Sequence, residues 1–305
     1  MEENKKCYTF ETYEYKDAIF GNVDATYIIH LEGNGRYEKI QEQLKRYHPT
    51  HKVHLVKNRG FRKCKKSAHI ETAAYDLIDA FLQIFKDAEE KQYGAILILE
   101  DDFQFDEKIL DPIHRERICT FLRAKENQEW IYLLGCVPIL QIPYDMYHSL
   151  VYSAGMHSVI YSPSYRKRIL AESQTSIHDW DVYHNITGVS RYTYYTPLCY
   201  QLFPVTENAL AWGSEAGGYI GYIFGQSGHF LFRTLHMDTS VDGYMVFYWV
   251  SKILFYVLVV FLLWILYGVY LWIRRSTIES IRESIRESKR PSKRESTIES
   301  KRRNK

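Results

Sequence analysis

Three consecutive acids follow directly on an apolar run in AILILEDDFQF, residues 95–105. Glu100, Asp101 and Asp102 carry like charges that repel one another, so we expect a positive group among them. If the run is a β-strand, alternation places Glu100 and Asp102 on one side and Asp101 on the other. Carboxylate oxygens suit a hard divalent cation, Mn²⁺ or Mg²⁺, which can neutralise a diphosphate leaving group. The alternative is a solvated acidic turn or helix start, where acids are also favourable.

A second group of candidate residues lies in SIHDWDVY, residues 176–183. It combines His178, Asp179 and Asp181, any of which could take a proton from an acceptor hydroxyl. Trp180 lies between the two acids, where it could stack on a sugar ring. The alternative is structural, with Asp179 as the N-cap of an amphipathic helix.

The elements that must position these residues alternate between strand and helix patterns. Runs rich in apolar and β-branched residues at 25–33 and 51–57 predict strands, and apolar spacing predicts helices at 36–47 and 67–92. With the strand at 95–100, this β-α-β-α-β order predicts an α/β fold with a mostly parallel sheet. Ligands of such sheets gather at the carboxyl ends of the strands, where the three acids lie.

The strongest single pattern lies near the C-terminus. Residues 253–273 contain no charge, and such a helix spans about 30 Å of hydrocarbon. Trp249 and Trp272 bracket this run as interfacial aromatics. We therefore expect a single transmembrane helix over 246–273, after an N-terminal extension (1–24) and a catalytic domain (25–242).

The charge distribution separates a basic tail from the rest of the chain. Residues 274–305 hold twelve Lys or Arg against five Glu, while the whole chain has a net charge of only +2. The rest of the chain is therefore near −5, which argues against a nucleic-acid partner. The low-complexity tail is expected to be mostly disordered and attracted to a membrane surface.

Cysteine usage and the N-terminal residues bear on the compartment. The five cysteines are odd in number and form no CxxC pair, so we expect free thiols and a reducing compartment: Cys7, Cys64, Cys119, Cys136 and Cys199. The N-terminus shows no secretory signal pattern, which favours a cytosolic domain with a C-terminal anchor. The basic tail also favours the cytosolic side, but a single membrane span places the domain and the tail on opposite sides, so the two expectations conflict. In the cytosol the sequon Asn185-Ile-Thr187 is idle.

Five segments resemble glycosyltransferase family 25, the lipooligosaccharide and procollagen galactosyltransferases, and glycosyltransferase-like proteins of large DNA viruses. They are YIIHLEGNGRYEKIQEQL, AILILEDDFQF, WIYLLGC, SAGMHSVIYSPSYRKRIL and PLCYQLF, all between residue 25 and about residue 212. LEDD is the most specific of these likenesses. TSIHDWDVY falls where that family keeps an acid needed for activity.

The resemblance implies a GT-A-like fold and metal-dependent transfer of a hexose from a UDP-sugar donor to a glycan or protein acceptor, with inversion. The alternative is a catalytically inactive, membrane-tethered binding module of the same fold. It arises because the family's G-C-x-x-S-H helix start is replaced here by RKCKKSAHIETAAYDL. The basic residues around this segment have two interpretations, attraction of a diphosphate or solvation of a loop. They are Lys57, Arg59, Arg62, Lys63, Lys65 and Lys66. A metal-dependent phosphohydrolase would need an HxD…DxxH pattern, which the sequence lacks.

The resemblance also assigns roles by position. Asp102 would be the principal metal ligand, with Glu100 or Asp101 contacting the metal or the donor. Asp181 would be the catalytic base, and Asp179 the alternative base or an acceptor-binding residue. Tyr27, Ile29 and Leu31 would line the nucleotide, and Arg36 would lie near phosphate. His236 would be a metal-binding histidine late in the chain.

Overall fold

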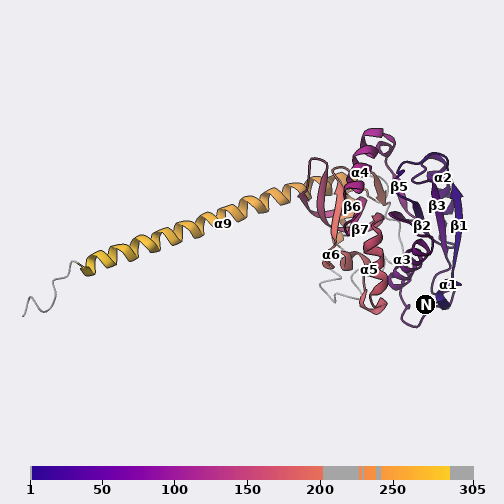
Figure 1. The fold of residues 1–305 in the computed structure, drawn as a ribbon, viewed down its shortest axis with the longest axis horizontal. Helices are drawn as coiled ribbons and strands as arrows, with labels where there is room; N and C mark the ends of the chain where they lie inside the picture. The colour runs from indigo at the N-terminus through magenta and orange to yellow at the C-terminus, as the bar shows by residue number, and fades with distance from the viewer. Residues whose placement is uncertain (1, 202–226, 229, 238–241, 289–305) are drawn as a thin grey trace, which may run out of the picture. The chain divides into compact units, whose positions relative to one another are not determined.

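The structure is a computed structural model that describes residues 2–201, 227–228, 230–237 and 242–288. It divides into two compact units, Met1–Lys252 and Ile253–Lys305. The first unit is a mixed α/β fold in which helices cover both faces of a central sheet (Figure 1).

A seven-stranded mixed sheet forms the centre of the first unit, in the order β1-β3-β2-β4-β7-β6-β8. The pairings β2–β3, β2–β4 and β6–β8 are parallel, whereas β7 and β1 pair antiparallel with their neighbours. The expected parallel order is therefore found in part, because a short hairpin joins β6 to β7 and forces antiparallel pairing there. The strands are β1 (Tyr8–Glu14), β2 (Ala25–Leu31), β3 (Lys52–Asn58), β4 (Ile96–Glu100), β6 (Trp130–Pro143), β7 (His148–Tyr161) and β8 (Ser190–Tyr194), with β5 (Phe103–Phe105) and β9 (Cys199–Gln201) in a separate pair.

The N-terminal residues belong to this fold. We expected residues 1–24 to form an extension, but β1 pairs with the whole length of β3, from Tyr8 opposite Asn58 to Glu14 opposite Lys52. Because β1 lies at the sheet edge, it covers β3, which would otherwise present unpaired main-chain groups.

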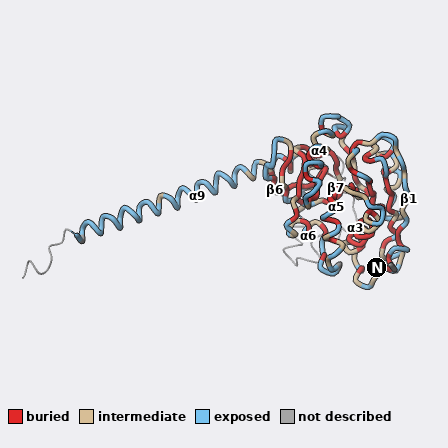
Figure 2. Tube along the Cα trace, viewed as in Figure 1, coloured by how far each residue is buried: buried red, intermediate tan, exposed pale blue. Residues whose placement is uncertain are grey.

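Two helical layers enclose the sheet, and many of the residues between them are buried (red in Figure 2). One hydrophobic cluster packs α3, α5 and α6 on one face, and a second packs α2 and α4 on the other. The helices are α1 (Glu2–Lys5), α2 (Tyr37–Arg46), α3 (Ala73–Glu90), η1 (Glu107–Leu110), α4 (Pro112–Ala124), α5 (Pro163–Ala171), η2 (Gln174–Ser176) and α6 (Trp180–Ile186). Helix α3 begins later than its apolar spacing predicts, because the Thr72 side chain caps it by accepting from Tyr75 N–H.

The connections around β2 define where a ligand site is expected. The chain runs from β2 through α2 to β3 on one side, and then through α3 to β4 on the other side of β2. Helices α2 and α3 cover opposite faces. The carboxyl ends of β2 and β4 therefore lie side by side where the strand order reverses, which is the usual position of a binding crevice in such sheets.

A long helix, α9 (Asp242–Ser288), closes the described chain. Its first residues belong to the first unit, and from Ile253 onward its apolar side chains are largely exposed (Figure 2). By length and composition it is able to cross a membrane, as the apolar run predicts. The helix continues through Ser288, so residues 274–288 of the expected disordered tail are helical. Residues 289–305 lie outside the described residues.

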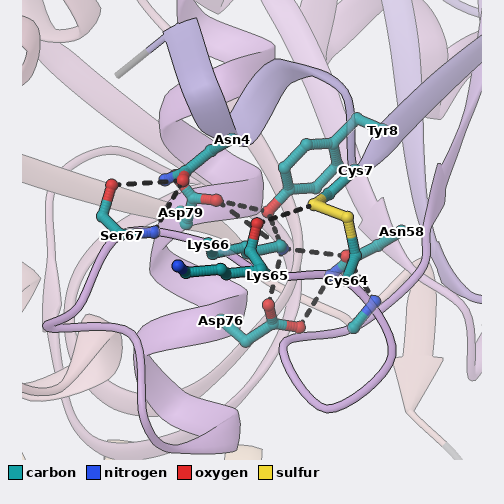
Figure 3. Close-up of a disulfide and its surroundings, with 11 residues drawn as sticks. Asn4, Cys7, Tyr8, Asn58, Cys64, Lys65, Lys66, Ser67, Asp76 and Asp79 are labelled. Atoms are coloured by element: carbon teal, nitrogen blue, oxygen red, sulfur yellow. Dashed lines mark hydrogen bonds and ion pairs between the residues drawn. A yellow bond between two sulfur atoms is a disulfide. The ribbon is translucent and has the colours of Figure 1, made fainter.

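The expectation of five free thiols is wrong for two cysteines. Cys7 and Cys64 form a disulfide, with their Cα atoms 5.7 Å apart (Figure 3). Spacing along the chain did not indicate this pair, because β1 is brought to β3 only by sheet pairing. Cys119, Cys136 and Cys199 remain free.

A buried polar network lies beside the disulfide (Figure 3). The Lys66 side chain is fully buried and its Nζ donates to Asp76 Oδ1 at 2.6 Å, with Asp79 Oδ2 at 3.6 Å. Tyr8 donates its hydroxyl to the same Asp79 oxygen at 2.7 Å. Because Lys66 is buried and paired with these residues, it is not accessible to a ligand that binds from solvent. It therefore neither attracts a diphosphate nor solvates a loop.

A candidate carboxylate site at the ends of β2 and β4

Arg36 is the positive group that the three acids require. Its Nη1 donates to Asp101 Oδ1 and lies 3.3 Å from Asp102 Oδ2. The turn between β2 and α2 delivers it there, because Gly33 and Gly35 adopt φ values of 83° and 75° that favour glycine. Arg36, expected near phosphate, therefore pairs with the acids.

Asp101 is the best satisfied of the three acids. Its Oδ2 accepts from Leu31 N–H at 3.2 Å and from Asn34 Nδ2, and His30 Nδ1 lies 3.5 Å away. Burial alone would raise the pKa of Asp101, but the contacts with His30 and Arg36 hold it below its ordinary value. Asp101 is thus an ionised anchor for the β2–α2 turn.

Asp102 and Glu100 carry charge that the structure does not fully compensate. The Asp102 side chain is 6% exposed, and its Oδ1 has no hydrogen-bond partner among the described residues. Burial, followed by repulsion from Asp101, raises its pKa to about 7. Burial also raises the pKa of Glu100 well above its ordinary value, with repulsion from Asp102 and Asp181 adding to the effect. A cation would relieve this strain on both acids.

Asp181 comes to the same site from α6. Its Oδ2 accepts from Gly155 N–H of β7 at 2.8 Å, and burial raises its pKa to about 6 despite that bond. Asn185 fixes the helix, since its Nδ2 donates to Ser153 O at 2.8 Å and to Asp181 O at 2.9 Å. The charge of Asp181 adds to the raised pKa of Glu100, so the two sequence motifs lie within electrostatic reach of each other.

The other residues of the HDWD motif make structural contacts, and His178 Nδ1 lies 2.7 Å from the Tyr75 hydroxyl. Asp179 is exposed and caps α6 by accepting from Val182 N–H at 2.8 Å, as the alternative interpretation predicts. Trp180 is buried, stacks on Phe81 at 4.6 Å and donates to Tyr161 at 3.1 Å. The expectation that Trp180 forms a sugar platform is therefore wrong.

Gln201, which our residue-by-residue assignment missed, bridges two of the acids. Its Nε2 lies 3.5 Å from Glu100 Oε2 and 3.4 Å from Asp102 Oδ2. Strand β9 reaches this position because Gly135 lacks a side chain, since a Cβ there would lie 1.6 Å from Cys199 O. The glutamine within PLCYQLF, a segment that resembles a family strand, was the available signal.

The residues expected to line a nucleotide are divided between the core and the site. Tyr27 and Ile29 are buried against α3, and the Tyr27 hydroxyl donates to Asp87 Oδ2 at 2.6 Å. Leu31 is 38% exposed at the end of β2. His236 is exposed on a turn with a φ of 54°, next to the buried Met237. The roles proposed for these residues stay predictions.

The donor set fits a hard cation only in part. Within the described ranges, no group of three or more His, Cys, Asp or Glu side chains is arranged to hold a metal ion. Mg²⁺ commonly takes only one or two carboxylates and completes its coordination with water and substrate phosphates. Asp102 Oδ1 and Glu100 could supply that number, so the residues fit a cation that binds together with a diphosphate.

The fold is α/β, and buried carboxylates form a candidate site where the strand order of its sheet reverses. No protein-family model and no curated protein matches this chain. Among solved structures, A197 from STIV is similar over 60% of this chain and 87% of that one, with 13% identity and a TM-score of 0.35. A glycosyltransferase involved in glycosylation of the major capsid of PBCV-1 is similar over 61% and 95%, with 12% identity and a TM-score of 0.34. Both TM-scores are below 0.5, so we base the functional proposal on the residues of this chain.

Proposed function

We propose that this protein is a metal-dependent glycosyltransferase of the family 25 type, with a GT-A-like fold and α9 as its membrane anchor. It transfers a hexose from a UDP-sugar to a glycan or protein acceptor with inversion. The observation that carries the proposal is the pair of acids at the end of β4, Glu100 and Asp102, where the buried Asp102 Oδ1 has no hydrogen-bond partner among the described residues. Asp181 lies near enough for its charge to add to the raised pKa of Glu100. Buried carboxylates that repel one another and have raised pKa values are typical of functional sites.

The donor side of the proposed site consists of Asp102, Glu100 and Arg36. Asp102 and Glu100 would hold Mn²⁺ or Mg²⁺, and the donor diphosphate would complete the coordination. A cation bound there would stabilise negative charge on the departing diphosphate. Arg36 has a guanidinium fork suited to phosphate oxygens and lies within reach of both Asp101 and Asp102. Asp101 keeps Arg36 at the site by pairing with it.

The acceptor side of the proposed site is Asp181. A pKa of about 6 leaves this carboxylate mostly ionised at neutral pH and still basic enough to accept a proton. It would take the proton of the acceptor hydroxyl as that oxygen attacks the anomeric carbon. Attack from the face opposite the diphosphate breaks the sugar–phosphate bond in one displacement, which inverts the anomeric configuration.

Calorimetry tests the donor half of this proposal. The full chain in detergent is titrated with UDP, with and without Mn²⁺, as wild type, as Asp102→Asn and as Glu107→Gln. Glu107 is a matched control because its carboxylate is close in sequence but 74% exposed and paired with Arg46. We expect Mn²⁺-dependent UDP binding in the wild type and in Glu107→Gln, and none in Asp102→Asn. Folded wild-type protein that does not bind UDP would refute the donor assignment.

The inactive binding module is the second candidate function. It is favoured by the ion pairs of Arg36 with Asp101 and Asp102, which already satisfy much of the acidic charge without a metal. Hydrolysis of UDP-hexoses in the presence of Mn²⁺ separates the two candidates. A chain that binds UDP but does not hydrolyse or transfer any hexose would be the binding module.

A further inference from the structure

The beginning of α9 contacts the carboxylate site through Gln201. The Tyr244 hydroxyl accepts a hydrogen bond from Gln201 N–H at 3.1 Å and donates one to the Gln201 carbonyl oxygen. A single hydroxyl thus holds both main-chain polar groups of the residue whose side chain lies between Glu100 and Asp102. The Tyr244 ring is fully buried within the first unit, in a cluster with Val137, Tyr200 and Met237.

This contact is a direct hydrogen-bonded link between α9 and the last residue of β9. Strand β9 is three residues long and pairs with the equally short β5, where Gln201 lies opposite Phe103. The Gln201 amide lies 3.5 Å from Glu100 and 3.4 Å from Asp102, at the long end of hydrogen-bond geometry. A main-chain shift of a few tenths of an ångström would therefore break both contacts.

The start of α9 is itself fixed to the sheet. Gln141 of β6 is fully buried, and its Nε2 donates to Tyr248 O at 3.0 Å and to Ser251 Oγ at 2.8 Å. Gly243 allows a close approach one residue before Tyr244, since a Cβ there would lie 2.6 Å from Leu235 O. Tyr244 is thus held from both directions along the helix.

We propose that Tyr244 is a positioning residue of the carboxylate site and acts through Gln201. On this inference the first turns of the apolar helix are part of the ligand site and not a linker to it. The inference rests on the proposed function only because binding of UDP with Mn²⁺ is used to measure it. A chain cut before residue 242 would lose the residue that holds Gln201 in place.

A double-mutant cycle on the full chain in detergent tests the proposal. The variants are Tyr244→Phe, Gln201→Ala, both together, and Tyr248→Phe. Tyr248 is the matched control, because it is equally buried four residues later and its hydroxyl contacts Thr193 Oγ1 at 3.1 Å, away from Gln201. UDP affinity at saturating Mn²⁺ is the first measurement. The second is the Gln201 side-chain amide resonance in ¹⁵N-glutamine-labelled protein, assigned by its absence in Gln201→Ala.

We expect Tyr244→Phe and Gln201→Ala each to weaken UDP binding about tenfold, the energy of one hydrogen bond to a charged site. The double variant should be no weaker than Gln201→Ala, because coupled residues are not additive. Tyr248→Phe should bind within twofold of the wild type. The Gln201 resonance should shift in Tyr244→Phe and stay in place in Tyr248→Phe. Additive losses, or wild-type affinity in Tyr244→Phe, would overturn the proposal.

Failure of the proposed function remains distinguishable. If the wild type does not bind UDP, the glycosyltransferase proposal fails, and the amide resonance alone decides the role of Tyr244. An unchanged resonance in Tyr244→Phe then overturns the inference. If Tyr244→Phe does not fold, Gln201→Ala carries the test, and its unchanged UDP affinity would equally overturn it.

Discussion

Asp102→Asn is expected to stabilise the protein at alkaline pH while removing its ligand binding. Burial, followed by repulsion from Asp101, raises the pKa of Asp102 from its ordinary value of 3.8 to about 7. A raised pKa means that the folded state holds the proton more tightly than the unfolded chain does. The stability that this group contributes is therefore complete below pH 4 and is lost as the pH rises through about 7. Asparagine has no carboxyl proton to lose and gains no charge as the pH rises, so the variant escapes this decline.

The magnitude follows from the size of the shift. A difference of about three pKa units corresponds to about 4 kcal/mol at pH 8, as an upper bound. At pH 5 the folded carboxyl is still protonated, so the stability gained by the variant is less than half of its value at pH 8. With about 2–4 °C of Tm per kcal/mol for a domain of this size, the gain at pH 8 is about 10 °C. Arg36 does not lose its counter-ion, because Asp101 remains.

Thermal unfolding at pH 5 and pH 8 measures this effect. Glu107→Gln is the control, and its Tm should match that of the wild type at both values, because an exposed carboxylate has little influence on stability. Adding Mn²⁺ and UDP at pH 8 should raise the Tm of the wild type and leave Asp102→Asn unchanged. A variant that is less stable than the wild type at pH 8, or that gains equally at both values, would refute the reasoning.

Three further predictions concern other parts of the molecule. Asp181→Asn should lower hexosyl transfer at least about 100-fold with UDP binding kept, and wild-type transfer should fall below pH 6 as this base is protonated; wild-type rates in Asp181→Asn would exclude it as the base. Gly135→Ala should cost about 1–3 kcal/mol by denaturant unfolding, because its Cβ would overlap Cys199 O; an unchanged midpoint would contradict the packing argument. Replacing Cys7 and Cys64 by Ala should cost about 4 kcal/mol, from the closed loop of 57 residues; equal unfolding midpoints with and without a reductant would show that the bond does not form.

Features that depend on short stretches of sequence were predictable. The run ILIL followed by acids indicates a buried strand that ends in acidic residues, and the structure has β4 there with Glu100 at its end. The spacing of apolar residues likewise indicates α3, and the 21-residue uncharged run indicates the apolar part of α9. In each case the pattern lies within one element, so the prediction does not depend on residues that are distant in the sequence.

Features that depend on contacts between distant segments were not predictable. Arg36 pairs with acids 65 residues away, and Tyr244 bonds to a residue 43 positions earlier. No local periodicity encodes such contacts, because sheet order decides them. Trp180 shows the same limit, since a tryptophan between two aspartates suggests exposure, whereas α6 turns it against α3.

The Cys7–Cys64 bond has a consequence for membrane orientation. Disulfides persist in oxidising compartments and are rare in the cytosol, so the bond argues against the cytosolic domain that we expected from the N-terminus. If α9 crosses a membrane once, a globular unit on the oxidising side leaves the Lys- and Arg-rich tail on the cytosolic side. That is the orientation favoured by the tendency of positive residues to stay inside. The disulfide and the basic tail thus agree with each other, against the expectation from the N-terminus, and one sulfur–sulfur bond becomes a marker of which side of the membrane the sugar chemistry would face.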